Sequence, residues 1–492
     1  MKEIHVKRIK DLREYIDELD QLGDIKNVTR EVDPYLEMAA VTRRGYDLHA
    51  PAPLFNNIRG AAKGMRAFGA PAAVSSMASQ PAARVALSVG LPASASWLDI
   101  VECLTRSIKA EPIAPRIVET APCKQHILHG DEASLDLFPI PYLHDGDGGP
   151  YCNTWGTIVA RTPDGKWTNW SIARIQKLDA HRMTGLFMLP QHIAMVWEEW
   201  RKIGKPMPFA LVQGCEPALP IVSSMPLGDY VNEGDYLGGH FGEPIEVVRC
   251  ETIDLEVPAS AEIVIEGHVS LDRDAEEGPF GEYPGYVVTD TSMQPVYHIE
   301  CISYRDGAIW PFIPEGRPID EYHTAVGVAM SAQTLSLLRD AELPITTVWS
   351  PLETANHWVF VTVPANWREQ LPGVNSEAFC KKIAETIWNT KFGSICPIIY
   401  VLDDDIDPSN PHDYLWAVAT RCHPTKRHVI DYGPILPLLA CYTDEERHAH
   451  TGERIVHDCL QLAPEAGRQP HSSFRGAYPK EIQDRVLKYW DQ

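Results

Sequence analysis

The chain has 492 residues, of which 44% are hydrophobic and 23% charged, a balance that excludes a mainly disordered or coiled-coil protein. Its 44 Lys and Arg stand against 67 Asp and Glu, and the net charge of −23 argues against nucleic acid and anionic membrane surfaces as partners. No apolar run reaches the roughly 18 residues of a membrane-spanning helix. No signal peptide and no Cys-x-x-Cys pair is recognised, so we expect a cytoplasmic protein whose 11 cysteines are reduced.

The first part of the chain reads as an α/β domain. Apolar residues at helical spacing predict a helix over 9–22, and Gly23 ends it. Short apolar runs separated by polar and proline-containing stretches continue to about residue 118. The turn-rich segment 139–149 is then expected to be a boundary loop.

The middle of the chain reads as a β domain. Runs at 157–161 and 166–177, on either side of a Thr-Pro-Asp-Gly turn, predict a hairpin. A helix is predicted over 190–203, because proline favours a helix start and glycine follows the last residue. The segments 208–225 and 245–305 are rich in Val, Ile, Tyr and Thr, which indicates strands.

The last part returns to alternating helices and strands, which predicts a third, α/β unit. In chain order the predicted elements are a helix at 324–341, strands at 346–349 and 358–363, a helix at 377–390, a strand at 397–402 and a C-terminal helix at 479–490.

Two carboxylates, Glu277 and Glu282, flank the sequence Gly-Pro-Phe-Gly. Close carboxylates can separate their pKa values, so that one stays protonated as an acid near neutral pH. The alternative, a solvated acidic turn, is the commoner outcome for such residues on their types alone.

Three further segments carry polar groups that suit a ligand site. Asn169 and Arg174 lie in one aromatic run, but five residues apart they face opposite sides of a regular strand, so a shared site needs a bulge or the reach of Arg. His192 begins the predicted helix, where its ring is expected to be neutral and able to bind a metal. Carbonyls near Ser223 with Glu233 offer hard oxygen ligands. The alternatives are a half-buried strand, a hydrogen-bonded histidine and an ordinary turn.

The order of these segments is more specific than any one of them. Trp167-Thr-Asn-Trp-Ser-Ile-Ala-Arg174, Pro190-Gln-His192, Ser223-Ser-Met-Pro, Glu233 and Glu277-Gly-Pro-Phe-Gly-Glu282 follow one another along the chain. This series resembles the UbiD family of reversible decarboxylases, closest to its ferulic acid decarboxylase branch. No position of the series is occupied by an unexpected residue type.

The resemblance implies an α/β (α+β) fold of three domains and a homodimer or higher homo-oligomer. The implied parts are an N-terminal α/β domain over 1–118, a split β-barrel like that of flavin reductases, which binds prenylated FMN, over 119–320, a C-terminal α/β domain over 321–475, and a terminal helix over 476–492. The active site is expected between the barrel and the C-terminal domain.

The resemblance also implies prenylated FMN as cofactor, supplied by a flavin prenyltransferase, together with Mn²⁺ (or Mg²⁺) and K⁺. The implied catalytic residues are Arg174, Glu277 and Glu282. The implied Mn²⁺ ligands are Asn169, His192 and Glu233, and the implied K⁺ ligands are Trp170, Val222, Ser223, Met225 and Glu233. The implied cofactor-binding residues are Thr154, Asn169, Ser171, Ile172, Gln191, His192, Ser223, Ser224, Met225, Pro226, Glu233 and Lys391. The implied substrate pocket consists of Met188, Gln191, Tyr322, His323, Val326, Ile395, Leu436 and Leu438.

The implied reaction is reversible, non-oxidative decarboxylation of an aromatic or heteroaromatic acid through a covalent adduct with the cofactor, with release of CO₂. Arg174 compensates the substrate carboxylate and Glu282 is the proton donor. The mainly apolar pocket suits a flat unsaturated or aromatic acid. Tyr322 and His323 are expected to add polar contacts to a ring hydroxyl or ring N–H, which favours a hydroxybenzoate, pyrrole or indole type of acid. The alternatives are a cinnamic or acrylic acid decarboxylase of the ferulic type, an FMN-dependent reductase, and a non-catalytic scaffold. The presence of all three implied catalytic residues, the Glu-Arg-Glu set of Glu277, Arg174 and Glu282, argues against the reductase and the scaffold.

Overall fold

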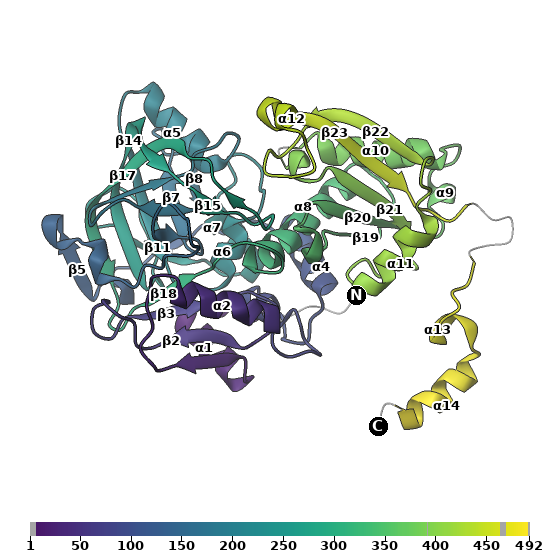
Figure 1. Ribbon diagram of the computed structural model, residues 1–492, viewed down its shortest axis with the longest axis horizontal. Coiled ribbons are helices and arrows are strands. Elements are labelled where there is room, and N and C mark those ends of the chain that lie inside the picture. Colours follow the sequence, from purple (N-terminus) through teal and green to yellow (C-terminus); the bar gives the residue numbers. More distant parts are fainter. Residues whose placement is uncertain (1–5, 391, 463–468, 491–492) are drawn as a thin grey trace.

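The computed structural model describes residues 6–390, 392–462 and 469–490. Figure 1 shows the N-terminal elements beneath a large β structure, and a separate helix-covered sheet beside them. The mixed α/β class with three parts, expected from the sequence, is confirmed. Among the described residues, no helix is long and apolar enough to cross a membrane. All 11 cysteines carry free thiols.

The N-terminal part is a four-stranded sheet with helices. The predicted first helix is confirmed but begins later, because the Asp11 side chain accepts a hydrogen bond from the Glu14 amide and caps it. The sheet order is β1-β2-β3-β18, so its last strand comes from the range predicted for the barrel. The elements are α1 (Leu12–Gln21), β1 (Ile25–Val28), α2 (Glu37–Leu48), β2 (Ala52–Phe55), β3 (Arg66–Gly69), α3 (Ala83–Ser88), α4 (Trp97–Ser107) and β18 (Ile309–Phe312).

The central part is a nine-stranded sheet in which β6-β9-β10-β17-β14-β11-β7-β8 follow one another and β5 pairs with β17. Smaller sheets join β13-β12-β4 and β15-β16. The strands are β4 (Arg116–Ile117), β5 (His126–His129), β6 (Tyr151–Asn153), β7 (Thr157–Arg161), β8 (Thr168–Ser171), β9 (Ile175–Lys177), β10 (Arg182–Gly185), β11 (Met207–Gln213), β12 (Glu246–Arg249), β13 (Glu256–Pro258), β14 (Ile263–Glu277), β15 (Phe280–Gly281), β16 (Val287–Val288) and β17 (Ser292–Tyr304). The helices are α5 (His192–Lys202), α6 (Ala218–Ser223) and α7 (Glu233–Phe241).

Three predictions for this part need correction. The run 166–177 is two strands, β8 and β9, so only its first half forms the hairpin with β7. The C-terminal part of the predicted β segment 208–225 is helix α6, whose proline lies in the first turn, where no backbone N–H is required. The segment 139–149 is no boundary: the Gly148 amide donates to the Pro279 carbonyl oxygen at 2.8 Å, inside the central part.

The C-terminal part is a five-stranded sheet in the order β19-β20-β21-β23-β22. The predicted helices and strands over 324–402 are confirmed, with their ends shifted by a few residues at most. The elements are α8 (Gly327–Asp340), β19 (Thr347–Trp349), β20 (Trp358–Val363), α9 (Trp367–Gln370), α10 (Ser376–Trp388), β21 (Ile398–Asp403), α11 (Pro411–Arg421), β22 (His428–Pro434), α12 (Asp444–Ala449) and β23 (Thr451–Asp458). The predicted C-terminal helix is α14 (Lys480–Trp490), which with α13 (Phe474–Ala477) lies apart from the other elements (Figure 1).

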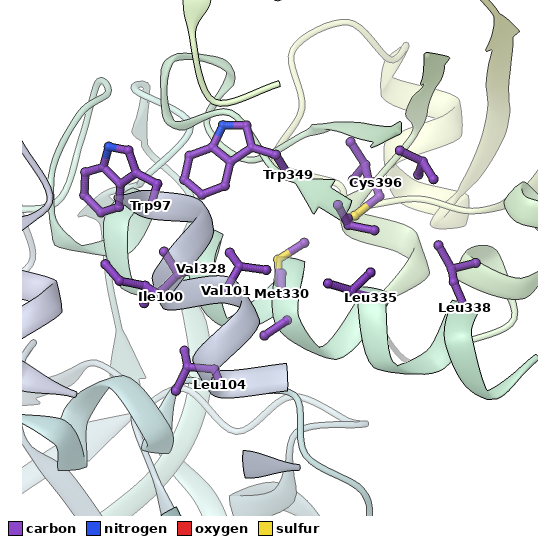
Figure 2. Close-up of a cluster of buried hydrophobic side chains, with 14 of the residues drawn as sticks. Trp97, Ile100, Val101, Leu104, Val328, Met330, Leu335, Leu338, Trp349 and Cys396 are labelled. Carbon is purple, nitrogen blue, oxygen red and sulfur yellow. The ribbon is translucent and has the colours of Figure 1, made fainter. Parts of the chain in front are cut away.

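One hydrophobic cluster connects the N-terminal segment to the C-terminal sheet. Figure 2 shows Val101 of α4 facing Met330 of α8, and Trp97 beside Trp349 at the end of β19. The two indole rings lie 6.0 Å apart. Burying these side chains together fixes α8, and with it the C-terminal part, against the rest of the molecule.

Leu335 of α8 is fully buried in this cluster. Leu335→Ala is expected to lower the free energy of unfolding by about 2–5 kcal/mol, because the side chain leaves a cavity. Leu415→Ala, at a position that is 53% exposed on α11, is the control and should change it by less than about 0.5 kcal/mol. Urea unfolding of the two variants measures both values, and equal losses would contradict the assignment.

Candidate active site

The three residues predicted to be catalytic meet in the structure. The Arg174 guanidinium donates from Nε to Glu277 Oε1 at 2.8 Å and from Nη2 to Oε2 at 3.0 Å. Its Nη1 donates to Glu282 Oε1. Arg174 lies in the break between β8 and β9, Glu277 ends β14 and Glu282 follows β15, so three separate segments converge on one ion-pair network.

The surroundings of this network raise the proton affinity of one of its acids. Glu277 is 1% and Glu282 7% exposed. Burial raises the pKa of Glu282, and the charge of Arg174 opposes that rise without cancelling it. Burial also acts to lower the pKa of Arg174, but the hydrogen bonds to Glu277 and the charge of Glu282 outweigh it and leave that pKa raised. The arrangement is thus a fixed cation beside a carboxyl that holds its proton more readily than a solvated one.

Tyrosine and phenylalanine side chains complete this environment. The Tyr151 hydroxyl donates to Glu277 Oε1 at 3.0 Å. The Arg174 guanidinium lies 4.8 Å from the centre of the Phe280 ring, in a cation–π contact. The first contact orients the Glu277 carboxylate and the second orients the guanidinium that it binds.

Glycines shape the loop between the two acids. Gly278 has φ +90°, a conformation that side chains with a Cβ rarely adopt, and its amide donates to Gln176 Oε1 at 2.9 Å. A Cβ on Gly148 would lie 2.0 Å from the Gly278 carbonyl oxygen. The loop therefore depends on the close approach of the segment that contains Gly148.

The predicted divalent-ion ligands also come together, from β8 and the first residues of α5 and α7. Asn169 Nδ2 donates to Glu233 Oε1 at 3.0 Å, and the Trp170 amide donates to Glu233 Oε2 at 2.8 Å. His192 Nδ1 lies 3.7 Å from Glu233 Oε1. His192 Nε2 lies 3.1 Å from Asp229 Oδ1.

Two oxygens at this site fit an additional ligand. Within the described part of the chain, Asn169 Oδ1 and Ser171 Oγ are buried and have no hydrogen-bond partner. They lie two residues apart on β8 and so share one face of the strand. An amide oxygen, an imidazole and a carboxylate together suit a hard divalent cation. Among the described residues, no three or more His, Cys, Asp and Glu side chains are grouped so that they could hold a metal ion. The set of Asn169, His192 and Glu233 has only two such residues, since Asn169 is an amide.

Several predicted potassium and cofactor positions lie in α6 and the turn that follows it. Ser223 Oγ lies 3.0 Å from Thr157 Oγ1. The carbonyl oxygens of Val222 and Met225 accept hydrogen bonds from nearby amides, at 3.0 and 2.8 Å. Thr154 Oγ1 accepts one from the Ile313 amide. Lys391, predicted to contact the cofactor phosphate, lies outside the described residues.

The predicted substrate-pocket residues come from both the barrel and the C-terminal part. Tyr322 stacks on Tyr283 with ring centres 3.6 Å apart. His323 is fully buried, its Nδ1 accepting from the Asp320 amide and its Nε2 donating to the Tyr283 carbonyl oxygen, both at 3.0 Å. Its ring nitrogens are thus already engaged. Of the other predicted pocket residues, Met188 and Gln191 are exposed. The remaining four are partly exposed: Val326, Ile395, Leu436 and Leu438.

Sequence reasoning missed several residues of this region. Tyr283 directly follows Glu282, and Phe280 lies inside the Gly-Pro-Phe-Gly loop, so their proximity was a usable signal. Tyr151 lies only three residues before Thr154, but nothing local linked it to Glu277, which is 126 residues away. His357 is an isolated polar residue far from the recognised segments.

Comparison with known families identifies the chain. Three family models match: the N-terminal domain of 3-octaprenyl-4-hydroxybenzoate carboxy-lyase over 16–104, its Rift-related domain over 116–318 and its C-terminal domain over 323–459. The chain belongs to the UbiD family and is a carboxy-lyase, as the sequence predicts.

Named relatives extend over almost the whole chain. Pyrrole-2-carboxylic acid decarboxylase of Pseudomonas aeruginosa is 40% identical over 98% of this chain and 97% of its own length. Ferulic acid decarboxylase 1 of Saccharomyces cerevisiae is 38% identical over 98% of this chain and 97% of its own length. Among solved structures, an evolved dimeric form of the UbiD-class enzyme HmfF from Pelotomaculum thermopropionicum in complex with prFMN is 26% identical, with a TM-score of 0.77, over 94% of this chain and 96% of that one.

Glu277→Gln tests how much the ion-pair network contributes to the free energy of unfolding. It is expected to lower the free energy of unfolding by about 1.5–3 kcal/mol, because a buried charged hydrogen-bond pair is lost while Glu282 still contacts Arg174. Glu276→Gln changes the exposed neighbour in the same strand and serves as the matched control. Urea unfolding compares them; a Glu277→Gln protein as stable as its control would refute the role of the pair in stability.

Proposed function

We propose that the protein catalyses reversible, non-oxidative decarboxylation of an aromatic or heteroaromatic carboxylic acid with prenylated FMN. The observation that carries this proposal is the buried network of Glu277, Arg174 and Glu282, which joins a fixed cation to a carboxyl of raised pKa. The named relatives act on a pyrrole carboxylic acid and on ferulic acid, and HmfF was solved with prFMN.

Each member of the network has a separate task in this proposal. Arg174 compensates the charge of the substrate carboxylate and orients it. When bound, the cofactor supplies an electron sink for the electrons of the C–C bond. Glu282 delivers its proton to the carbon that has lost CO₂, and in the reverse direction it removes that proton. Glu277, held by Tyr151, keeps the guanidinium in place.

Asn169, His192 and Glu233 are proposed to hold a divalent ion, Mn²⁺ or Mg²⁺, that binds the cofactor phosphate. The unpaired, buried Asn169 Oδ1 of the described structure supports this, because an ion would satisfy it. The carbonyl oxygens of Trp170, Val222, Ser223 and Met225, with Glu233, are proposed for K⁺. A flavin prenyltransferase is the proposed source of the cofactor, and we propose that the enzyme works as a cytoplasmic homo-oligomer.

A second candidate substrate class is an acrylic acid of the cinnamic type. The yeast relative, named as a ferulic acid decarboxylase, favours it. Release of CO₂ from a panel that pairs cinnamic acid with pyrrole, indole and hydroxybenzoic carboxylic acids distinguishes the two classes.

Glu282→Gln tests the proton donor. The variant, co-produced with a flavin prenyltransferase, should keep the prenylated flavin but lose about 100-fold or more in the rate of CO₂ release, because an amide cannot deliver the proton. Glu300→Gln, on the barrel surface, should retain the wild-type rate. In the wild type, the rate should fall as pH rises through the raised pKa of Glu282, since the acid form is then lost. A Glu282→Gln enzyme with normal turnover would falsify this role.

His192→Ala tests the metal site. Loss of the imidazole should lower both Mn²⁺ content, measured by elemental mass spectrometry, and bound flavin, measured by absorbance, because the ion links the protein to the phosphate. His298→Ala, at an exposed position of β17, is the control. Unchanged metal and flavin content in His192→Ala would eliminate His192 as a ligand.

A further inference from the structure

A second histidine packs against Tyr283, the residue after Glu282, and carries a buried nitrogen without a partner among the described residues. His357, in the turn before β20, is 7% exposed, and its ring centre lies 5.6 Å from that of Tyr283. Tyr283 follows Glu282 directly and stacks on Tyr322. The Tyr283 ring, which His357 contacts, thus belongs to the residue next in sequence to the proposed proton donor.

The hydrogen bond of the other ring nitrogen fixes the form of this histidine. His357 Nδ1 lies 2.8 Å from the Ile395 carbonyl oxygen. A carbonyl oxygen only accepts, so Nδ1 carries the hydrogen. Burial lowers the pKa of His357 to about 4, so the ring is neutral at pH 7. Nε2 therefore presents a lone pair and can only accept a hydrogen bond.

Nothing in the described structure donates to that lone pair: His357 Nε2 is buried and has no hydrogen-bond partner. Buried acceptors in folded proteins are normally paired, so this lone pair is open to a hydrogen-bond donor that the described chain does not supply. His323, the histidine expected in the substrate pocket, differs in having both nitrogens engaged. Of these two rings, His357 is the one that can accept from a substrate.

The chemistry of Nε2 selects the ligand. A carboxylate, an ether or a furan oxygen has no hydrogen to give, whereas a ring N–H or a ring hydroxyl does. The position agrees, since His357 bonds to Ile395 and adjoins the Tyr283–Tyr322 stack, and Ile395 and Tyr322 are predicted pocket residues.

We propose that His357 determines specificity, its Nε2 accepting a hydrogen bond from a ring N–H or ring hydroxyl of the aromatic acid. This rests on the proposed decarboxylase function and narrows its substrates to acids with a donor on the ring. A site with a buried acceptor rejects an analogue that lacks the donor, because the acceptor is then left unpaired.

Binding of matched acids tests this without turnover. The pairs are pyrrole-2-carboxylic with furan-2-carboxylic acid, and 4-hydroxybenzoic with 4-methoxybenzoic acid, so that ring N–H and hydroxyl donors are separated. Titration calorimetry uses the Glu282→Gln holoenzyme as parent. In at least one pair, the donor acid should bind roughly tenfold or more tightly than its partner.

Two substitutions of His357 separate its two nitrogens. In His357→Asn the amide can still donate to the Ile395 carbonyl, but nothing replaces Nε2, so the preference for the donor acid should disappear. In His357→Gln the side-chain oxygen reaches the position of Nε2, so part of the preference should return. His298→Asn, at an exposed position, should keep the full preference.

The outcomes are distinct. Equal Kd values within both pairs, or an unchanged preference in a folded His357→Asn protein, overturn the role of His357 and leave the decarboxylase proposal intact. Failure of all four acids to bind, together with no CO₂ release by the wild type from the wider panel, overturns both. If His357→Asn does not fold, the test is the ¹⁵N chemical shift of Nε2 in the parent protein, assigned by its loss in His357→Gln. This shift should change when the donor acid binds and not when its partner binds. An equal change with both acids overturns the role of His357.

Discussion

The pairing of Arg174 with Glu277 and Glu282 is the interaction on which the rest of this structure depends. One guanidinium faces two buried carboxyl groups, so the network carries one more negative charge than positive if both acids ionise. Both carboxyl groups are buried, and an uncompensated buried charge is costly. A proton on one acid removes the excess, which is why burial raises the pKa of Glu282. The burial that requires these charges to be paired therefore also keeps Glu282 more readily protonated, as a general acid needs.

The network also requires several parts of the chain to meet. Its residues come from the break after β8, the end of β14 and the loop after β15. The segment containing Gly148 supports the turn between β14 and β15. The C-terminal part reaches the same place through the stack of Tyr322 on Tyr283. Helices α4 and α8 hold that part by apolar burial (Figure 2). The candidate site is therefore a product of packing between parts rather than of one domain.

In the part of the chain that the structure describes, buried polar atoms without a hydrogen-bond partner lie at several points of this site, the Tyr283 hydroxyl among them, and two of these points differ in chemistry. Within the described residues, Asn169 Oδ1 and Ser171 Oγ lie unsatisfied at one point, near Glu233, and His357 Nε2 lies unsatisfied at the other, beyond Tyr283. The first point offers oxygens that suit a cation and a phosphate, and the second offers a nitrogen that suits a donor on an aromatic ring. The Glu-Arg-Glu network belongs to neither set, because its groups already satisfy one another.

The sequence by itself determined the family, the alternating helices and strands of the C-terminal part, and the residue types of the network. Hydrophobic periodicity and the order of motifs are properties of the sequence itself, so they can be read without a structure. Only the tertiary structure decided that Arg174 lies in a break between β8, which holds Asn169, and β9, and that α6 replaces a predicted strand. It alone showed that segment 139–149 supports the acidic loop and that β18 completes the N-terminal sheet. It alone placed His357 against Tyr283. Contacts between residues far apart in the chain arise from packing, whose partners no local pattern records.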